Sequence, residues 1–220
     1  YADRILEGEY SDSTKTLVRA MLNYGAAAQM YFYHNPYDLA TKGLDMTDME
    51  EVAVPDQNYA TILHAPEGVD GITFHGASLV LKSQTTLRCY FKLDAGKNIS
   101  AYDFEGKQVQ SITSNGEVLY YVDITDIAPQ QLDAAYTVYI NGQAFVSYNP
   151  MAYIQRVYHK DTTADLLKNL MKALYGYYEA AIAYVYEDNA TVTLPTATGG
   201  TVTADKNSYK LGDTVTLTVT

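Results

Sequence analysis

The sequence of 220 residues contains no tryptophan and a single cysteine, Cys89. One cysteine cannot form an internal disulfide, and zinc sites that need several cysteines are excluded. Basic residues are also scarce, 15 against 26 acidic residues, so the net charge is −11. We therefore expect no nucleic acid partner, because nucleic acids attract basic surfaces. No apolar run reaches the roughly 18 residues that a membrane-spanning helix needs, so we also expect no membrane insertion.

Signals for catalysis and for cofactor binding are missing as well. The four histidines are scattered, and no Gly-x-Ser-x-Gly elbow, His-Glu-x-x-His helix or phosphate-binding glycine loop accompanies them. The nearest approach to a carboxylate pair is Asp123 with Asp126. Glycosidase pairs are assembled from distant residues, so this spacing is weak support for an enzyme. We expect a protein that is not an enzyme, with no catalytic residues, no cofactor and no metal site.

An internal repeat relates residues 1–35 to residues 153–188. The corresponding residues recur mostly three, four or seven positions apart, which is the spacing of one helix face. Each copy therefore predicts a short helix, a polar turn and a longer helix. The corresponding pairs are Tyr1 and Tyr153, Arg4 and Arg156, Leu17 and Leu170, Ala20 and Ala173, Tyr24 and Tyr177, Ala27 and Ala180, Ala28 and Ala181, Tyr31 and Tyr184, and Tyr33 and Tyr186.

The helix boundaries follow from local signals. Asn149 can cap a helix and Pro150 suits its first position, so a helix is predicted from about 150 to about 159. The longer helices are predicted at about 14–33 and about 164–186. The sequence His-Asn-Pro that follows the first of them ends it.

The chain contains 22 tyrosines, and the repeat divides them into two groups. The repeated tyrosines alternate with alanines that allow close helix approach, so core packing is favoured over a ladder that stacks a ligand. Tyrosines that are not repeated are better surface candidates. Two of them, Tyr175 and Tyr178, stand where the first copy has Leu22 and Gly25. The exposed candidates for binding are Tyr37, Tyr158, Tyr175 and Tyr178.

Between the two copies, from about residue 72 to 148, the hydrophobic period changes from 3.6 to 2. Asn115-Gly116 and Asn141-Gly142 are strong hairpin signals, because both central residues of a type I′ turn need a positive φ. Cys89 lies on the apolar phase of one strand and is expected to be an inert core thiol. The predicted strands are Ile72 to Leu81, Leu87 to Leu93, Ile99 to Phe104, Val109 to Thr113, Val118 to Ile124, Tyr136 to Ile140 and Ala144 to Tyr148.

The predicted architecture is α+β, an antiparallel β-sandwich flanked by two related helical hairpins, with a partial C-terminal β repeat. An acidic stretch before the strands is interpreted as a solvated linker over the sandwich, because it lacks the pattern of a calcium loop. The chain ends inside an alternating strand pattern, so we expect a piece of a longer protein. The segments are a helical hairpin at 1–40, the acidic linker at 41–71, the β-sandwich at 72–149, a second helical hairpin at 150–188 and the partial β repeat at 189–220.

Two patterns in the repeat carry a family resemblance. The first is Leu17 to Gln29 followed by Tyr31-Phe32, and the second is Tyr153-Ile154 with Leu170, Lys172 to Tyr175, Ala180-Ala181 and Tyr184. Together they resemble the repeated modules of large secreted or wall-attached surface proteins from gut Gram-positive bacteria of the clostridial kind. The tail from Gly199 to Thr203 resembles the opening of a short β repeat of such proteins. The resemblance implies an extracellular location, at the cell surface or cell wall, and transfers no catalytic residue.

Three functions are left open by these observations. The first is a non-catalytic module that binds or adheres to a host extracellular protein, such as mucin or immunoglobulin, or to a glycan, since tyrosine provides large amphipathic contact area. The second is a structural spacer in a surface stalk that contacts neighbouring modules of the same chain. The third is an accessory domain of a carbohydrate-active enzyme. A binding module predicts a solvent-facing tyrosine patch of several hundred Å², whereas a spacer predicts that Tyr175 and Tyr178 lie against a neighbour.

Overall fold

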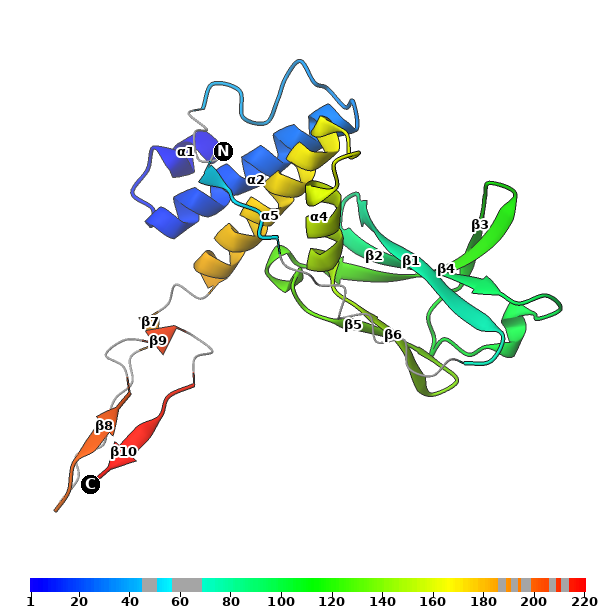
Figure 1. Ribbon diagram of the computed structural model, residues 1–220. Helices are drawn as coiled ribbons and strands as arrows, with labels where there is room; N and C mark the ends of the chain where they lie inside the picture. The colour runs from blue at the N-terminus through cyan, green and yellow to red at the C-terminus, as the bar shows by residue number, and fades with distance from the viewer. Residues whose placement is uncertain are drawn as a thin grey trace.

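A computed structural model describes residues 1–44, 51–56, 69–185, 189–190, 194, 199–205, 209–210 and 214–220. Within these residues the fold is α+β, with four α-helices and a four-stranded antiparallel sheet. Figure 1 shows the helices gathered on one side and the longer strands on the other, with α4 between α5 and the strands. In the described part of the chain, none of the helices has the length and apolar character needed to span a membrane.

Side-chain caps explain where two of the helices begin. The Ser11 side chain accepts a hydrogen bond from the Thr14 backbone N–H at 3.2 Å. Asn149 accepts one from the Met151 N–H at 2.7 Å, as expected for a cap in front of Pro150. The three helices expected at 14–33, 150–159 and 164–186 are confirmed, with ends shifted by one or two residues. The observed helices are α1 Ala2–Leu6, α2 Asp12–Tyr31, α4 Pro150–His159 and α5 Asp165–Val185.

The described strands between α2 and α4 form two antiparallel sheets. The larger has the order β1-β2-β4-β3, and the smaller pairs β5 with β6. Both Asn-Gly hairpins are confirmed, since Asn115, Gly116, Asn141 and Gly142 all have positive φ angles between 52° and 81°. The strands are β1 Ile72–Leu81, β2 Thr85–Leu93, β3 Gln110–Ser114, β4 Glu117–Ile127, β5 Tyr136–Ile140 and β6 Gln143–Tyr148.

One predicted strand is wrong. The segment from Ile99 to Phe104 contains a short 3₁₀ helix, Ile99–Ala101, instead of a strand. The Asn98 side chain accepts hydrogen bonds from the Ser100 backbone N–H and hydroxyl, both at 3.0 Å. This local capping competes with strand pairing, and the apolar alternation of the segment did not reveal it. A second 3₁₀ helix, Pro129–Gln131, follows β4.

The described residues after α5 form two short strand pairs. β7 Asn189–Ala190 pairs with β9 Tyr209–Lys210, and β8 Val202–Ala204 pairs with β10 Leu217–Val219. The strand pattern noted near the end of the sequence therefore overlaps β10. That this tail is part of a bacterial surface repeat stays a prediction.

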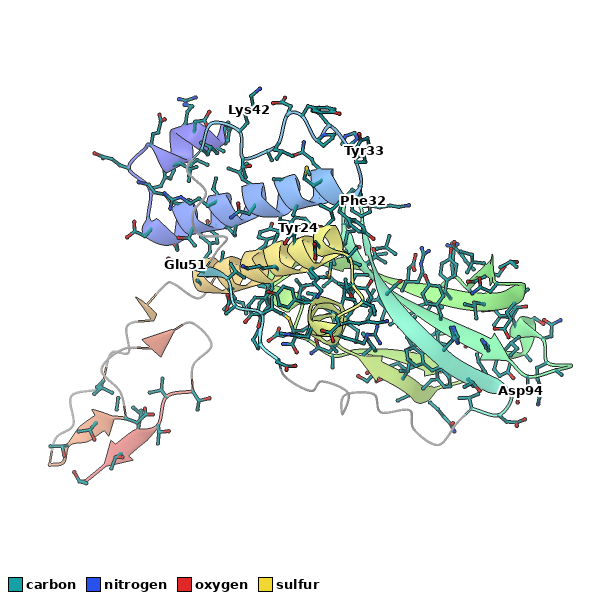
Figure 2. All side chains as sticks on the ribbon, turned by 45° about the horizontal axis from the view of Figure 1, so that its top comes forward. Tyr24, Phe32, Tyr33, Lys42, Glu51 and Asp94 are labelled. Carbon is teal, nitrogen blue, oxygen red and sulfur yellow. The ribbon has the colours of Figure 1, made fainter. Side chains whose placement is uncertain are left out.

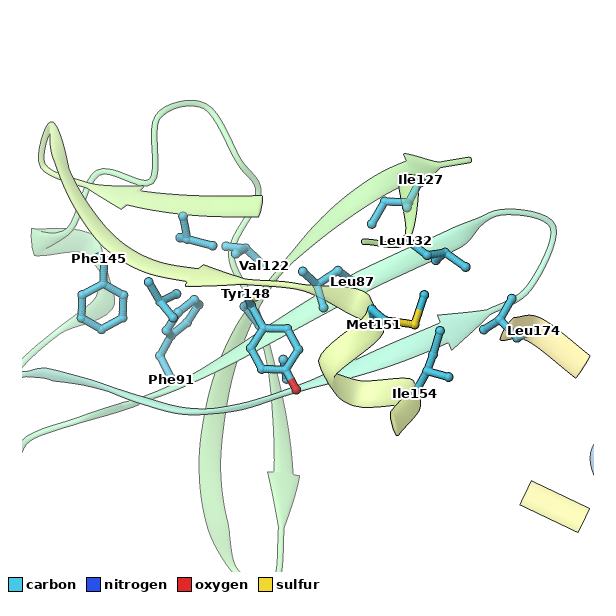
Figure 3. Close-up of a cluster of buried hydrophobic side chains, with 14 of the residues drawn as sticks. Leu87, Phe91, Val122, Ile127, Leu132, Phe145, Tyr148, Met151, Ile154 and Leu174 are labelled. Atoms are coloured by element: carbon cyan, nitrogen blue, oxygen red, sulfur yellow. The ribbon is translucent and has the colours of Figure 1, made fainter. Parts of the chain in front are cut away.

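One hydrophobic core joins the strands to α4 and α5 (Figure 3). The ring of Phe91 on β2 lies 5.7 Å from the ring of Phe145 on β6, which links the two sheets. Ile154 of α4 and Leu174 of α5 are buried in the same cluster. Each such side chain contributes roughly 1.5–3 kcal/mol through burial. Cys89 is fully buried, as expected, and burial raises the pKa of its thiol to about 12.

Helices α2 and α5 lie side by side and run in opposite directions (Figure 1). Tyr24 and Tyr177, which correspond in the sequence repeat, stack on each other with ring centroids 5.8 Å apart. Burial raises the pKa of Tyr24 to about 12. Both rings are half-buried between α2 and α5, which agrees with the expectation of packing, but Tyr31 and Tyr184 are exposed, so the expectation is wrong for them. Both lie in the last turn of their helices, at the edge of the packed region.

Candidate functional site

Tyr175 is buried and Tyr178 is half-buried, so the expectation that both are exposed is wrong. Tyr175 is 7% exposed and belongs to the core, and Tyr178 packs against it. Their ring centroids are 5.8 Å apart, and the Tyr175 hydroxyl donates a hydrogen bond to Glu179 at 2.9 Å.

The other two predicted binding residues differ from each other. Tyr158 on α4 is half-buried and packs against the core, so it is not the exposed residue that was expected. Its ring contacts that of His159 edge to face, with centroids 4.9 Å apart. Tyr37 is 86% exposed, as expected. Of the four candidates, Tyr37 alone is available for binding as the sequence predicted.

Three further exposed aromatic residues lie close to Tyr37 in the sequence, at the end of α2. Tyr31, Phe32 and Tyr33 are exposed as well, and Tyr33 reaches 76%. Figure 2 shows Phe32 and Tyr33 at the end of α2. Tyr31 and Phe32 touch edge to face, with ring centroids 4.9 Å apart. We call residues 31–37 the aromatic turn, and it is the candidate binding site.

The end of α2 gives the aromatic turn its shape. The His34 N–H donates a hydrogen bond to the Gln29 carbonyl at 2.9 Å, which closes the helix with a Schellman-type end. Tyr33 occupies the left-handed position of this motif, with φ at 53°, where glycine is usual. Asn35 has φ at 50°, and Pro36 prevents a return to helix. A strained backbone therefore presents Tyr33 to solvent.

The side chain of Gln29 holds the aromatic turn and the residues after it against α2 through three hydrogen bonds. Its Oε1 accepts a hydrogen bond from the Ala40 N–H at 2.7 Å. Its Nε2 donates to the Asp38 carbonyl at 3.0 Å and to the Asn35 carbonyl at 3.4 Å. Three bonds from one side chain hold the loop against α2, so the aromatic groups are presented by an ordered backbone.

The aromatic turn borders α4. Burial raises the pKa of Tyr153 on α4, and nearby Tyr31 raises it further. The guanidinium of Arg156 lies over the Tyr153 ring, 5.6 Å from its centroid. The aromatic turn therefore has a cation, Arg156, near its border with α4, although the net charge of the chain is strongly negative.

Asp123 and Asp126, the nearest approach to a carboxylate pair in the sequence, have different hydrogen-bond partners. Asp123 accepts two hydrogen bonds from Arg88, each 2.7 Å long, and raises the pKa of that guanidinium. Asp126 instead accepts a bond from the Thr125 hydroxyl at 2.9 Å. The two carboxylates that resembled a pair in the sequence therefore have separate partners. In the part of the chain with described coordinates, no group of three or more His, Cys, Asp and Glu residues is placed to hold a metal ion.

The described part of the acidic linker packs on helices. Val54 is buried in the core, and Nε2 of His159 lies 3.1 Å from both the Val54 and the Pro55 carbonyl oxygens. Val52 lies over Gly176 of α5, where an added Cβ would be 3.0 Å from its methyl carbon. Four acidic residues of this linker, Asp45, Asp48, Glu50 and Glu67, lie outside the described residues.

Hollows line several parts of α2. One of about 310 Å³ lies between α2, α5 and residues 51–52, and its lining includes the carboxylates Glu51 and Glu179. Another, of about 450 Å³, opens between α2 and the β1–β2 turn, beside Met21. Neither could be predicted from the sequence, because each is formed by segments far apart in the chain.

The sequence pointed to one residue of the aromatic turn, Tyr37, and missed Phe32 and Tyr33. Both were assigned to the helix or its repeated stripe, whereas α2 ends at Tyr31. The sequence His34-Asn35-Pro36 did predict an end of the helix, but it does not show that the helix stops before Phe32, because helix ends are uncertain by one or two residues. Comparison with protein-family models, with curated proteins and with solved structures gives no match for this chain. Its function is therefore inferred from its own geometry.

Proposed function

We propose that this chain is a non-catalytic extracellular module of a bacterial surface protein, and that its aromatic turn binds a host protein or a glycan. The observation that carries the proposal is the exposed group Tyr31, Phe32, Tyr33 and Tyr37 on a backbone clamped by Gln29. Large exposed aromatic groups gathered in one place are typical of interaction surfaces. A host mucin or immunoglobulin is the partner class that we put forward first.

The chemistry of the aromatic turn suits either kind of ligand. A tyrosine ring offers an apolar face on which a sugar or a side chain can stack, and its hydroxyl can form a hydrogen bond. Because the loop is already ordered, little conformational entropy is lost when a partner binds. The net charge of −11 favours a neutral or basic patch on that partner.

The architecture that we propose around this site is a β-sandwich formed by the two sheets, flanked by two related helical hairpins. Ring contacts between the sheets support it, including Phe74 with Tyr148 at 6.3 Å. A location at the cell surface or in the cell wall is part of the same proposal, and it rests on the family resemblance described for the sequence.

A structural spacer is the second candidate function. It is favoured by a different observation: the face formed by α1 and α2 is incompletely buried. The two functions are compatible, since the aromatic turn and that face use different residues.

The test is a binding measurement with the immobilised chain and purified mucin, secretory immunoglobulin and host glycans in separate arms. The double variant Phe32→Ser/Tyr33→Asn removes two aromatic groups of the turn, and asparagine tolerates the left-handed backbone at position 33. The control variant Tyr1→Ser/Tyr10→Ser removes two exposed rings elsewhere.

We expect binding in at least one arm, weakened about tenfold or more in the turn variant, because aromatic anchors dominate such interfaces. The control variant should bind like the natural chain. Equal weakening in both variants, or no binding in any arm at micromolar concentration, contradicts the proposal.

A further inference from the structure

The two helix pairs have corresponding sequences but differ in burial. On α5, Leu170 is fully buried and Leu174 is 1% exposed. On α2 the corresponding residues are Leu17, which is half-buried, and Met21, which is 47% exposed. The same apolar positions are therefore covered in the second copy and incompletely covered in the first.

The cover in the second copy is the β unit, which we define as residues 72–148. Leu174 of α5 and Ile154 of α4 share one buried cluster with Leu87 of β2 and with Leu132, which follows the second 3₁₀ helix (Figure 3). The apolar positions that α5 contributes to this contact surface recur in α2, whereas Ile154 of α4 corresponds to the smaller Ala2 of α1. No residue of α1 is fully buried, and α2 contributes no fully buried residue to that cluster, although Tyr24, Ala27 and Ala28 pack against it.

A tyrosine and an arginine are repeated at the same interface. In the second copy, Tyr153 packs against the core, and the guanidinium of Arg156 lies over its ring. Arg156 is close enough to Tyr148 at the end of β6 to oppose the rise that burial causes in its pKa. In the first copy, Tyr1 and Arg4 hold the corresponding positions; Tyr1 is exposed where Tyr153 is half-buried, while Arg4 and Arg156 are both exposed.

The α2 face is also open beside Met21. The hollow of about 450 Å³ there is lined by Met21, Tyr24 and Tyr177, together with Lys82 of the β1–β2 turn and Asp126 of β4. At the corresponding position of α5, Leu174 is enclosed by the core. The open face thus continues directly from the existing contact between the helices and the β unit.

We propose that α1 and α2 form a docking face for a second β unit of the same kind, joined ahead of α1 as residues 72–148 are joined ahead of α4. The apolar positions Leu17, Val18 and Met21 would then be covered as Leu170, Met171 and Leu174 are. The β unit of another copy of this chain cannot take this place, because α4 and α5 already cover its inner face. The inference uses none of the aromatic turn and does not rest on ligand binding there.

The experiment adds a second copy of residues 69–152 directly ahead of Tyr1 in the complete chain, so that Tyr1 takes the place of Tyr153. A thiol probe is introduced by Met21→Cys on the proposed face. The matched control is Met30→Cys, since nine residues along a helix at 100° per residue place it on the opposite face. Both methionines are exposed on α2, so both substitutions should leave the fold intact.

Labelling by a thiol reagent is compared between the unextended and the extended chain. In the unextended chain both introduced thiols should react. In the extended chain, labelling at position 21 should slow by about 100-fold, as for a site that reacts only after local opening, while position 30 is unchanged. The Cys89 residue of the added unit reports on that unit, because it is fully buried when the unit is folded.

Two results overturn the inference. Undiminished labelling at position 21, with Cys89 of the added unit protected, means that the unit folds without docking on α1 and α2. Reactive Cys89 in the added unit means that α1 and α2 do not supply the cover that α4 and α5 provide. Neither result bears on the aromatic turn, because no ligand is present.

Discussion

The substitution Gln29→Ala tests whether one side chain orders the aromatic turn. It removes the acceptor of the Ala40 N–H and the donor to the Asp38 and Asn35 carbonyls, bonds of 2.7, 3.0 and 3.4 Å. A typical bond contributes about 0.5–1.5 kcal/mol net, and the longest of these contributes least. The local stability of the loop should therefore fall by about 1–2 kcal/mol. Because alanine favours helix, the global free energy of unfolding should change by less than about 1 kcal/mol.

Amide hydrogen exchange followed by NMR measures this directly. The Ala40 amide should exchange about 5–30 times faster in the variant, since 1.4 kcal/mol corresponds to a tenfold change. The variant Gln29→Glu is the control, because it keeps an acceptor for that amide and loses the donor to the two carbonyls. Unchanged exchange at Ala40 in the alanine variant would refute the clamp. Faster exchange at all amides of α2 and α5 would refute it too, by showing a global effect.

Three other predictions concern the folded core. Burial holds the pKa of Tyr24 at about 12 against 10.0 for a free tyrosine, so the free energy of unfolding should be constant below pH 10 and fall as the pH rises to 12. Phenolate absorbance and urea midpoints measure this, and a urea midpoint that does not change between pH 10 and 12 contradicts it. Asn149→Ala should cost about 0.5–2 kcal/mol in urea unfolding, because it removes the α4 cap while the Met151 N–H keeps its bond to the Leu132 carbonyl. An unchanged urea midpoint would show that the cap is replaceable. Gln155 is 3% exposed, and its side-chain amide has no hydrogen-bond partner within the described ranges. Because an unpaired buried amide is costly, Gln155→Met should stabilise the chain by about 1–2 kcal/mol. A lower urea midpoint for this variant would contradict the reasoning.

Local chemistry made much of the fold predictable. The Asn-Gly turns require positive φ angles, and Asn149 before Pro150 specifies a helix start, so these elements follow from a few neighbouring residues. The segment after Asn98 was mistaken for a strand because its apolar spacing matched one, while a side chain bonded to its own backbone set a different conformation.

The candidate site was harder to predict because exposure depends on tertiary packing. Tyr175 has no tyrosine counterpart in the first copy and was predicted to be a surface residue, yet the core covers it. Tyr33 lies inside the repeat and was taken for a helix residue, yet its left-handed backbone turns it to solvent. The repeat identified equivalent positions correctly at Tyr24 and Tyr177, which stack, but it could not tell which copy the β unit covers.

Hydroxyl-radical footprinting of the chain with and without purified mucin or immunoglobulin is the most direct measurement of where a ligand binds. We expect protection at Phe32, Tyr33 and Tyr37 in the bound state, with Tyr10 unchanged, because Tyr10 is exposed and lies at the other end of α2. Protection at Tyr10 without protection of the turn, or bound ligand that protects none of these rings, would contradict binding by the aromatic turn.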